Sequence, residues 1–207
     1  HTYGQELPTK QISIAVSHTS TVLICPLTIP SEQLNLQILW EIVSFDPPKP
    51  HTMDVKNDTR FLLESYGKSL MIRNVTTDDA RIWKCCCNDN CSTINLVVLD
   101  YENIRSFNPG PIKNYGQINV GIKEEFFITV HHNKMLNVEV TNAEYTNETK
   151  VCYEIKRVCR ASYGVEYAKM ENCRQITIQI SGEGLTETYL LNIVTNGKKI
   201  LIELYGE

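Results

Sequence analysis

The stretch that decides the fold covers residues 69–85 and reads SLMIRNVTTDDARIWKC. Its first part places apolar side chains at Leu70 and Ile72, at the two-residue spacing of a β-strand. The polar residues 76–79 then supply turn chemistry, because short polar side chains form hydrogen bonds to their own backbone. We therefore predict a strand, a tight turn and the start of a second strand that ends at a cysteine.

Two upstream residues extend this pattern. Cys25 precedes Cys85 by 60 residues and closes the apolar run TVLIC, and Trp40 lies between them in LQILW. Together with Asp79 and Trp83, these residues resemble one domain of the immunoglobulin superfamily. In that family two cysteines join strand B to strand F across a β-sandwich, and the tryptophan of strand C packs on the bridge. The resemblance implies a Cys25–Cys85 disulfide, with both tryptophans in the core.

The resemblance covers residues 10–100, about half the chain, and departs from the family at two positions. Trp83 stands where a corner tyrosine is usual, so the indole N–H would have to supply the corner hydrogen bond. Arg81 stands where a small residue is usual. The family also pairs an arginine before the preceding strand with the corner aspartate, which implies an ion pair between Arg60 and Asp79. Two unrelated surface charges are the alternative.

The cysteine-rich run CCCNDNC begins at Cys85, the last residue of the decisive stretch. Asn and Asp tolerate left-handed backbone conformations, so Asn88, Asp89 and Asn90 are predicted to form a hairpin turn and are the candidate ligand-binding residues.

Side-chain alternation in the strand before this turn directs Cys85 and Cys87 inward and Cys86 outward. A short bridge from Cys87 or Cys86 to Cys91 would stiffen the hairpin. Three adjacent cysteines on a strand cannot converge on one tetrahedral ion, so we predict no metal site there.

The length of 207 residues suits two domains of about a hundred residues each. We place an immunoglobulin-like domain at 1–100, a linker with the NPGP break at 101–116, and a second β-sandwich at 117–207. In the second domain Tyr189 occupies a corner position but Leu191 replaces the expected cysteine, so an immunoglobulin-like or a fibronectin-like sandwich fits. The fold class is therefore all-β, with two tandem sandwiches. The strands of the second are expected at residues 117–122, 125–131, 136–140, 150–158, 174–180, 188–194 and 199–204, with an Asn196-Gly197 turn between the last two.

The eight cysteines favour an oxidising compartment. The first domain holds five and the second holds Cys152, Cys159 and Cys173, so both counts are odd. If every cysteine is bridged within the chain, an odd number of bridges must cross between domains. We hypothesise one such bridge from the pair Cys86/Cys87; free thiols or a disulfide-linked dimer are the alternatives.

Three sequons predict N-glycosylation, at Asn57, Asn74 and Asn147. The chain starts at His1 without an apolar leader, and no run approaches 18 apolar residues. We therefore expect an extracellular protein, either secreted or the ectodomain of a membrane protein. The formal net charge of −4 gives no broad basic surface, which argues against nucleic acid as a partner.

No catalytic constellation is visible: the chain has no G-x-S-x-G, no H-E-x-x-H and no Gly-rich loop between a strand and a helix. His131 and His132 are adjacent, so on a strand their rings face opposite sides and indicate a solvated strand end. We therefore expect no enzyme, no cofactor and no small-molecule substrate. The resemblance instead implies recognition of a protein ligand, such as a cytokine or an immune cell-surface counter-receptor. The alternative is a cell-adhesion or structural protein that acts by self-association.

Overall fold

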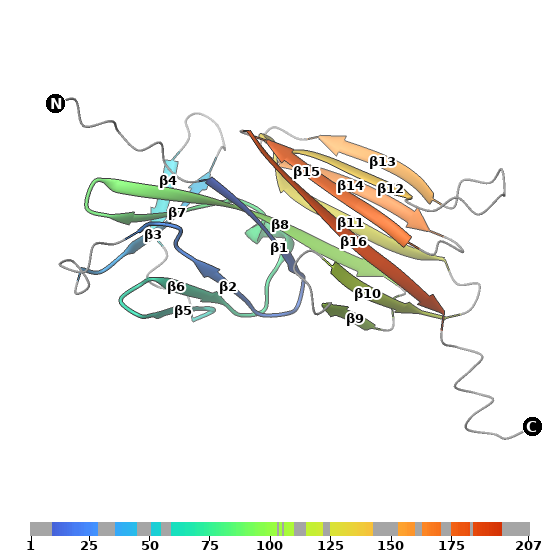
Figure 1. Ribbon diagram of the computed structural model, residues 1–207, viewed down its shortest axis with the longest axis horizontal. Coiled ribbons are helices and arrows are strands. Elements are labelled where there is room, and N and C mark those ends of the chain that lie inside the picture. The colour runs from blue at the N-terminus through green and yellow to red at the C-terminus, as the bar shows by residue number, and fades with distance from the viewer. Residues whose placement is uncertain are drawn as a thin grey trace, which may run out of the picture. The chain divides into compact units, whose positions relative to one another are not determined.

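A computed structural model gives an all-β fold (Figure 1). It describes residues 10–28, 36–44, 51–54, 59–102, 104, 106–109, 115–121, 125–142, 153–159, 163–170, 175–182 and 184–195. Within these ranges no helix has the length and apolar character needed to cross a membrane. The chain divides into two compact units, one of His1–Val98 with Ala161–Tyr163 and one of Leu99–Arg160 with Gly164–Glu207.

The first unit contains two sheets. One has the strand order β2-β6-β5, and the other runs β8-β7-β3-β4 with β1 paired to β8. The decisive stretch forms β6, a short 3-10 turn over Thr77–Asp79, and most of β7. The bounds are β1 Lys10–Val16, β2 Thr21–Ile24, β3 Leu39–Ser44, β4 His51–Asp54, β5 Phe61–Glu64, β6 Ser69–Ile72, β7 Ile82–Cys87 and β8 Asn90–Glu102.

Alternate side chains of these strands fill one core. Leu23 of β2 and Leu70 of β6 are buried from one sheet, and Trp83 of β7 from the other, all within one apolar cluster. The disulfide between Cys25 and Cys85 joins the end of β2 to β7, with an S–S distance of 2.10 Å and a Cα–Cα distance of 6.0 Å. The two sheets of the unit are thus covalently tied through the core.

The second unit also has two sheets, and β8 contributes to it from Leu99 onward. One sheet has the order β13-β14-β11-β8 and the other β12-β15-β16-β10-β9. β10 and β16 pair in parallel, whereas β15 and β16 pair antiparallel. The bounds are β9 Ser106–Pro109, β10 Tyr115–Val120, β11 Phe126–Asn133, β12 Asn137–Asn142, β13 Tyr153–Cys159, β14 Tyr163–Met170, β15 Gln175–Gly182 and β16 Leu185–Thr195.

The predicted all-β class with two sandwiches is confirmed, and the first unit ends close to the predicted bound at residue 100. The division between the units falls inside β8, after Val98. The expected linker 101–116 holds the end of β8 and the short strand β9, which pairs with β10. Pro109 ends β9 at the edge of its sheet, where the missing N–H is tolerated. β14 was not predicted, and the Asn196-Gly197 turn with the strand expected at 199–204 lies outside the described residues.

Removing the disulfide between the sheets tests how much it contributes to the stability of the first unit. The variant Cys25→Ala/Cys85→Ala should lose about 4 kcal/mol of unfolding free energy, because the bridge closes a loop of 60 residues. Urea denaturation monitored by tryptophan fluorescence measures this loss. A loss below about 1 kcal/mol would show that the sheets hold together without the bridge.

The second unit should lose stability at high pH through Tyr189. Burial, and secondarily the nearby Glu187 carboxylate, raise the pKa of this phenol to about 12. In the unfolded chain this phenol ionises near pH 10. Its contribution to the unfolding free energy is therefore fully present below pH 10 and is lost as the pH rises from 10 to 12. Urea titrations at pH 9 and 11 should therefore show wild type losing about 1 kcal/mol more than Tyr189→Phe. Equal losses in both proteins would contradict this assignment.

Candidate functional site

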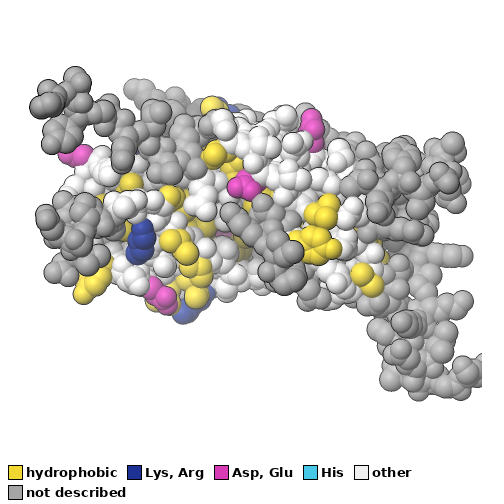
Figure 2. Space-filling model, viewed as in Figure 1, with side chains coloured by type: hydrophobic (Ala, Val, Ile, Leu, Met, Phe, Trp, Pro, Cys, Tyr) yellow, Lys and Arg dark blue, Asp and Glu magenta, His cyan; other side chains and the backbone are white. Residues whose placement is uncertain are grey.

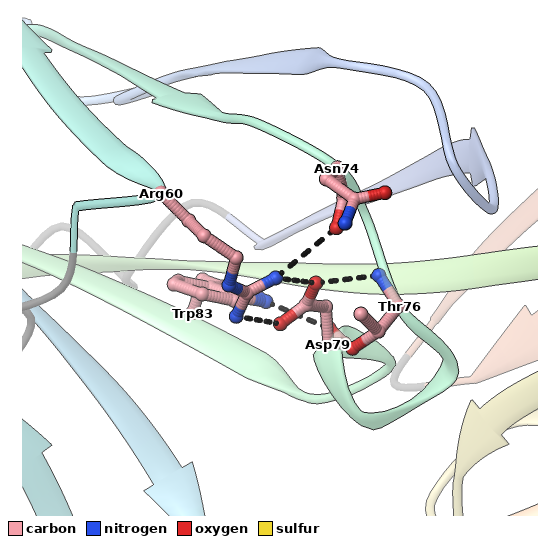
Figure 3. Close-up of polar contacts among 5 residues, drawn as sticks. All are labelled: Arg60, Asn74, Thr76, Asp79 and Trp83. Atoms are coloured by element: carbon pink, nitrogen blue, oxygen red, sulfur yellow. Dashed lines mark hydrogen bonds and ion pairs between the residues drawn. The ribbon is translucent and has the colours of Figure 1, made fainter.

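The predicted partners Arg60 and Asp79 meet at the corner of the first unit (Figure 3). Arg60 precedes β5 and its guanidinium donates two hydrogen bonds to the carboxylate, Nη1 to Oδ2 at 2.9 Å and Nη2 to Oδ1 at 3.1 Å. The backbone N–H of Thr76 donates to the same Oδ2 at 2.8 Å. Asp79 is only 5% exposed, so these donors replace the water that burial removes from the carboxylate.

Trp83 completes this corner from β7. Its indole N–H donates to the backbone carbonyl of Asp79 at 3.0 Å, which is the role that the sequence assigned to it in place of a tyrosine hydroxyl. The ring is fully buried and stands edge-on to Phe61, with 5.6 Å between ring centroids. The aspartate thus binds the arginine with its side chain and the tryptophan with its backbone, as Figure 3 shows.

Trp40 lies opposite Cys85 in the β3–β7 register and is 2% exposed, so it reaches the core beside the bridge. Its indole N–H donates to the carbonyl of Gly67 at 2.6 Å, a contact the sequence analysis missed. Gly67 has φ +85°, and a Cβ there would lie 2.3 Å from the carbonyl oxygen of Ile38. Only glycine fits at this position of the turn. The glycine in the pair Tyr66-Gly67 was therefore the sequence signal that could have indicated the turn.

The hairpin between β7 and β8 carries the second disulfide. Cys86 and Cys91 are directly opposite in the ladder and are bonded, with a Cα–Cα distance of 4.1 Å. The loop consists of Asn88 and Asp89, with Asn88 at φ +55°, while Asn90 already pairs with Cys87. The three candidate residues 88–90 are all exposed. One residue pair, Cys87 and Asn90, therefore separates the bridge from an exposed two-residue loop.

Of the two bridges to Cys91 that the sequence left open, the one from Cys86 is confirmed and the one from Cys87 is wrong. Cys87 is a buried free thiol, because alternation turns it into the core while Cys86 and Cys91 share the opposite face. The proposed crossing bridge from Cys86 or Cys87 is therefore absent from the described structure. Cys152 and Cys173 lie outside the described residues.

The described residues contain no group of three side chains that could hold a metal ion. The expectation of a solvated end at His132 was also wrong. Its ring is 5% exposed, with Nε2 3.9 Å from a carboxylate oxygen of the buried Glu166, because His132 occupies the inward-facing register of β11. Of the predicted glycosylation sites, Asn74 is exposed at φ +49°, while Asn57 and Asn147 lie outside the described residues.

Comparison with known proteins gives similarity at the level of structure alone. No family model matches the chain, and no curated protein sequence is similar to it. The extracellular domain of the voltage-gated sodium channel β4 subunit is 21% identical over 48% of this chain and 92% of its own, with a TM-score of 0.34. The extracellular portion of mouse CD200RLa is 10% identical over 91% of this chain and 100% of its own, with the same TM-score of 0.34. The titin I9–I11 tandem is 15% identical over 91% of this chain and 65% of its own, with a TM-score of 0.34.

The fold of the first unit follows from its own geometry. Two sheets tied through the core by Cys25–Cys85, a tryptophan opposite Cys85, and an Arg–Asp pair at the corner form an immunoglobulin-like sandwich.

The corner ion pair should matter far more than an exposed one. Arg60→Met leaves the Asp79 carboxylate buried without its main partner and should cost about 3 kcal/mol of unfolding free energy. Lys169→Met is the matched control, because Lys169 and Glu125 form a largely exposed pair at 3.3 Å and its loss should cost less than about 1 kcal/mol. Urea denaturation of both variants makes the comparison. Equal losses of unfolding free energy in the two variants would show that burial does not strengthen the Arg60–Asp79 ion pair.

Proposed function

We propose that this chain is an extracellular protein-binding module, a receptor ectodomain or a secreted decoy. Its ligand is a protein such as a cytokine or an immune cell-surface counter-receptor. The observation that carries the proposal is the exposed loop of Asn88 and Asp89, on a hairpin that the Cys86–Cys91 bridge closes one residue pair before the loop. A loop fixed in this way loses little conformational freedom when a partner binds, which favours affinity.

The hairpin also has an apolar neighbour. Leu39 of β3 is 46% exposed and lies opposite Cys86, so the side chain of Leu39 and the bridge share the outward face of the sheet. Asn88 and Asp89 provide polar groups at the adjoining loop, whereas Asn90 lies opposite Cys87, on the other face of the ladder. An apolar centre with a polar rim is the usual anatomy of a protein–protein interface. We call this surface, made by Leu39, Cys86–Cys91, Asn88 and Asp89, the hairpin surface.

The two disulfides support the extracellular location, because such bonds persist in oxidising compartments. The corner and core groups that the structure brings together satisfy one another: the Asp79 carboxylate is bound by arginine and backbone, and both indole N–H groups are bound by carbonyls. Their arrangement serves stability. Recognition is therefore assigned to the outward surface.

Binding to a panel of secreted and cell-surface immune proteins, by surface plasmon resonance, tests the proposal. We expect at least one protein to bind, and Leu39→Asp to weaken that binding by about tenfold or more. Met135→Asp is the matched control, because Met135 is an equally exposed apolar residue of the second unit, and it should bind as wild type does. Silence across the panel, or equal loss in both variants, would contradict the proposal.

A further inference from the structure

The outer face of the sheet β2-β6-β5 is apolar where a polar surface is expected. Val22, Met71 and Leu62 stand side by side in register across its three strands, and Val22 is 48% and Leu62 38% exposed. The next outward row contains Ile24, which is 60% exposed. In Figure 2 hydrophobic side chains gather over this region, with acidic and basic side chains beside them.

This exposure is a property of the face and does not reflect poor packing. In the alternate row of the same strands, Leu23 and Leu70 are almost completely buried in the core and Leu63 is partly buried against it. An antiparallel sheet that faces water on one side normally alternates apolar-in with polar-out. A contiguous apolar patch on the outer side therefore indicates a surface that another protein covers.

Charges of opposite sign flank the apolar row. Arg73 follows Met71 by two residues on the same face, and its backbone N–H continues the ladder to Arg60 at 2.8 Å. On the other side, Glu64 of β5 pairs in register with Ser69 of β6. Both charged residues are exposed, and among the described residues neither has an ion-pair partner. Along the strand direction, the face therefore has a basic residue, Arg73, then the apolar row, then an acidic residue, Glu64.

We propose that this face binds the same face of a second copy of the chain, about a two-fold axis that runs along the row Val22–Met71–Leu62. Such an axis reverses the strand direction and places each apolar row on its counterpart. It also places Arg73 of each copy over the row of Ser69 and Glu64 of the other. Neighbouring strands are about 4.8 Å apart, so a guanidinium over Ser69 reaches the Glu64 carboxylate.

The resulting contact is self-complementary, as a two-fold interface requires, with two equivalent Arg73–Glu64 pairs flanking an apolar centre. A partner with a charge of one sign would satisfy only one side of the row, so the arrangement favours a second copy. The face has only three strands, so the contact lies at the small end of interface sizes, below about 1,200 Å² in total. We therefore expect a weak dimer that forms at micromolar or higher concentration. This self-association goes beyond ligand binding at the hairpin surface.

Sedimentation equilibrium of the glycosylated, secreted chain over a wide concentration range tests the proposal. Wild type should dimerise. Arg73→Glu should weaken the dimer by about tenfold or more, because both ion pairs become contacts between like charges. The double variant Arg73→Glu/Glu64→Arg exchanges the two charges and should restore dimerisation.

Leu39→Asp serves as the control, because it alters the hairpin surface on the other sheet and should leave self-association unchanged. Circular dichroism of each variant confirms that the fold is intact. A wild-type protein that stays monomeric at the highest concentration, or a double variant that fails to recover, would overturn the proposal. Either result leaves the hairpin surface untested and the proposed ligand binding unaffected.

Discussion

The covalent bridge between Cys25 and Cys85 is the constraint on which the first unit depends. It joins β2 of one sheet to β7 of the other, so the two layers cannot separate while it is intact. Trp40 faces Cys85 in the neighbouring strand and is anchored by its hydrogen bond to Gly67, at the turn between β5 and β6. A single side chain therefore connects the central strand of one sheet to a turn of the other.

The corner around Asp79 provides a second tie, made of polar groups. One buried aspartate receives Arg60 from the start of β5 and the backbone of Thr76, and its own carbonyl accepts the indole N–H of Trp83. Each of these bonds would be weak at the surface, but here they satisfy groups that are cut off from water. Replacing the corner tyrosine by tryptophan preserves the hydrogen bond and adds buried aromatic area.

The sequence was most informative where side chains alternate along a strand and where several residues match the spacing of the immunoglobulin pattern. The strand at Leu70, the turn at Asp79 and the direction of Cys87 into the core could all be read from residue spacing. The partner of Cys91 could not, because Cys86 and Cys87 are both close to it in sequence and only the ladder register distinguishes them. The parallel pairing of β10 with β16 was equally invisible, since parallel neighbours are far apart in the chain and no local turn marks them.

The bridge and the corner fix the scaffold that carries both surfaces to which we propose to assign recognition, the hairpin surface and the outer face of β2-β6-β5. Disulfide mapping tests the central constraint most directly. A digest of the non-reduced protein, with free thiols alkylated after unfolding, is analysed by fragmentation mass spectrometry. The account predicts Cys25 joined to Cys85, Cys86 joined to Cys91, and Cys87 alkylated. A peptide in which Cys25 is joined to Cys87, or is itself alkylated, would contradict it.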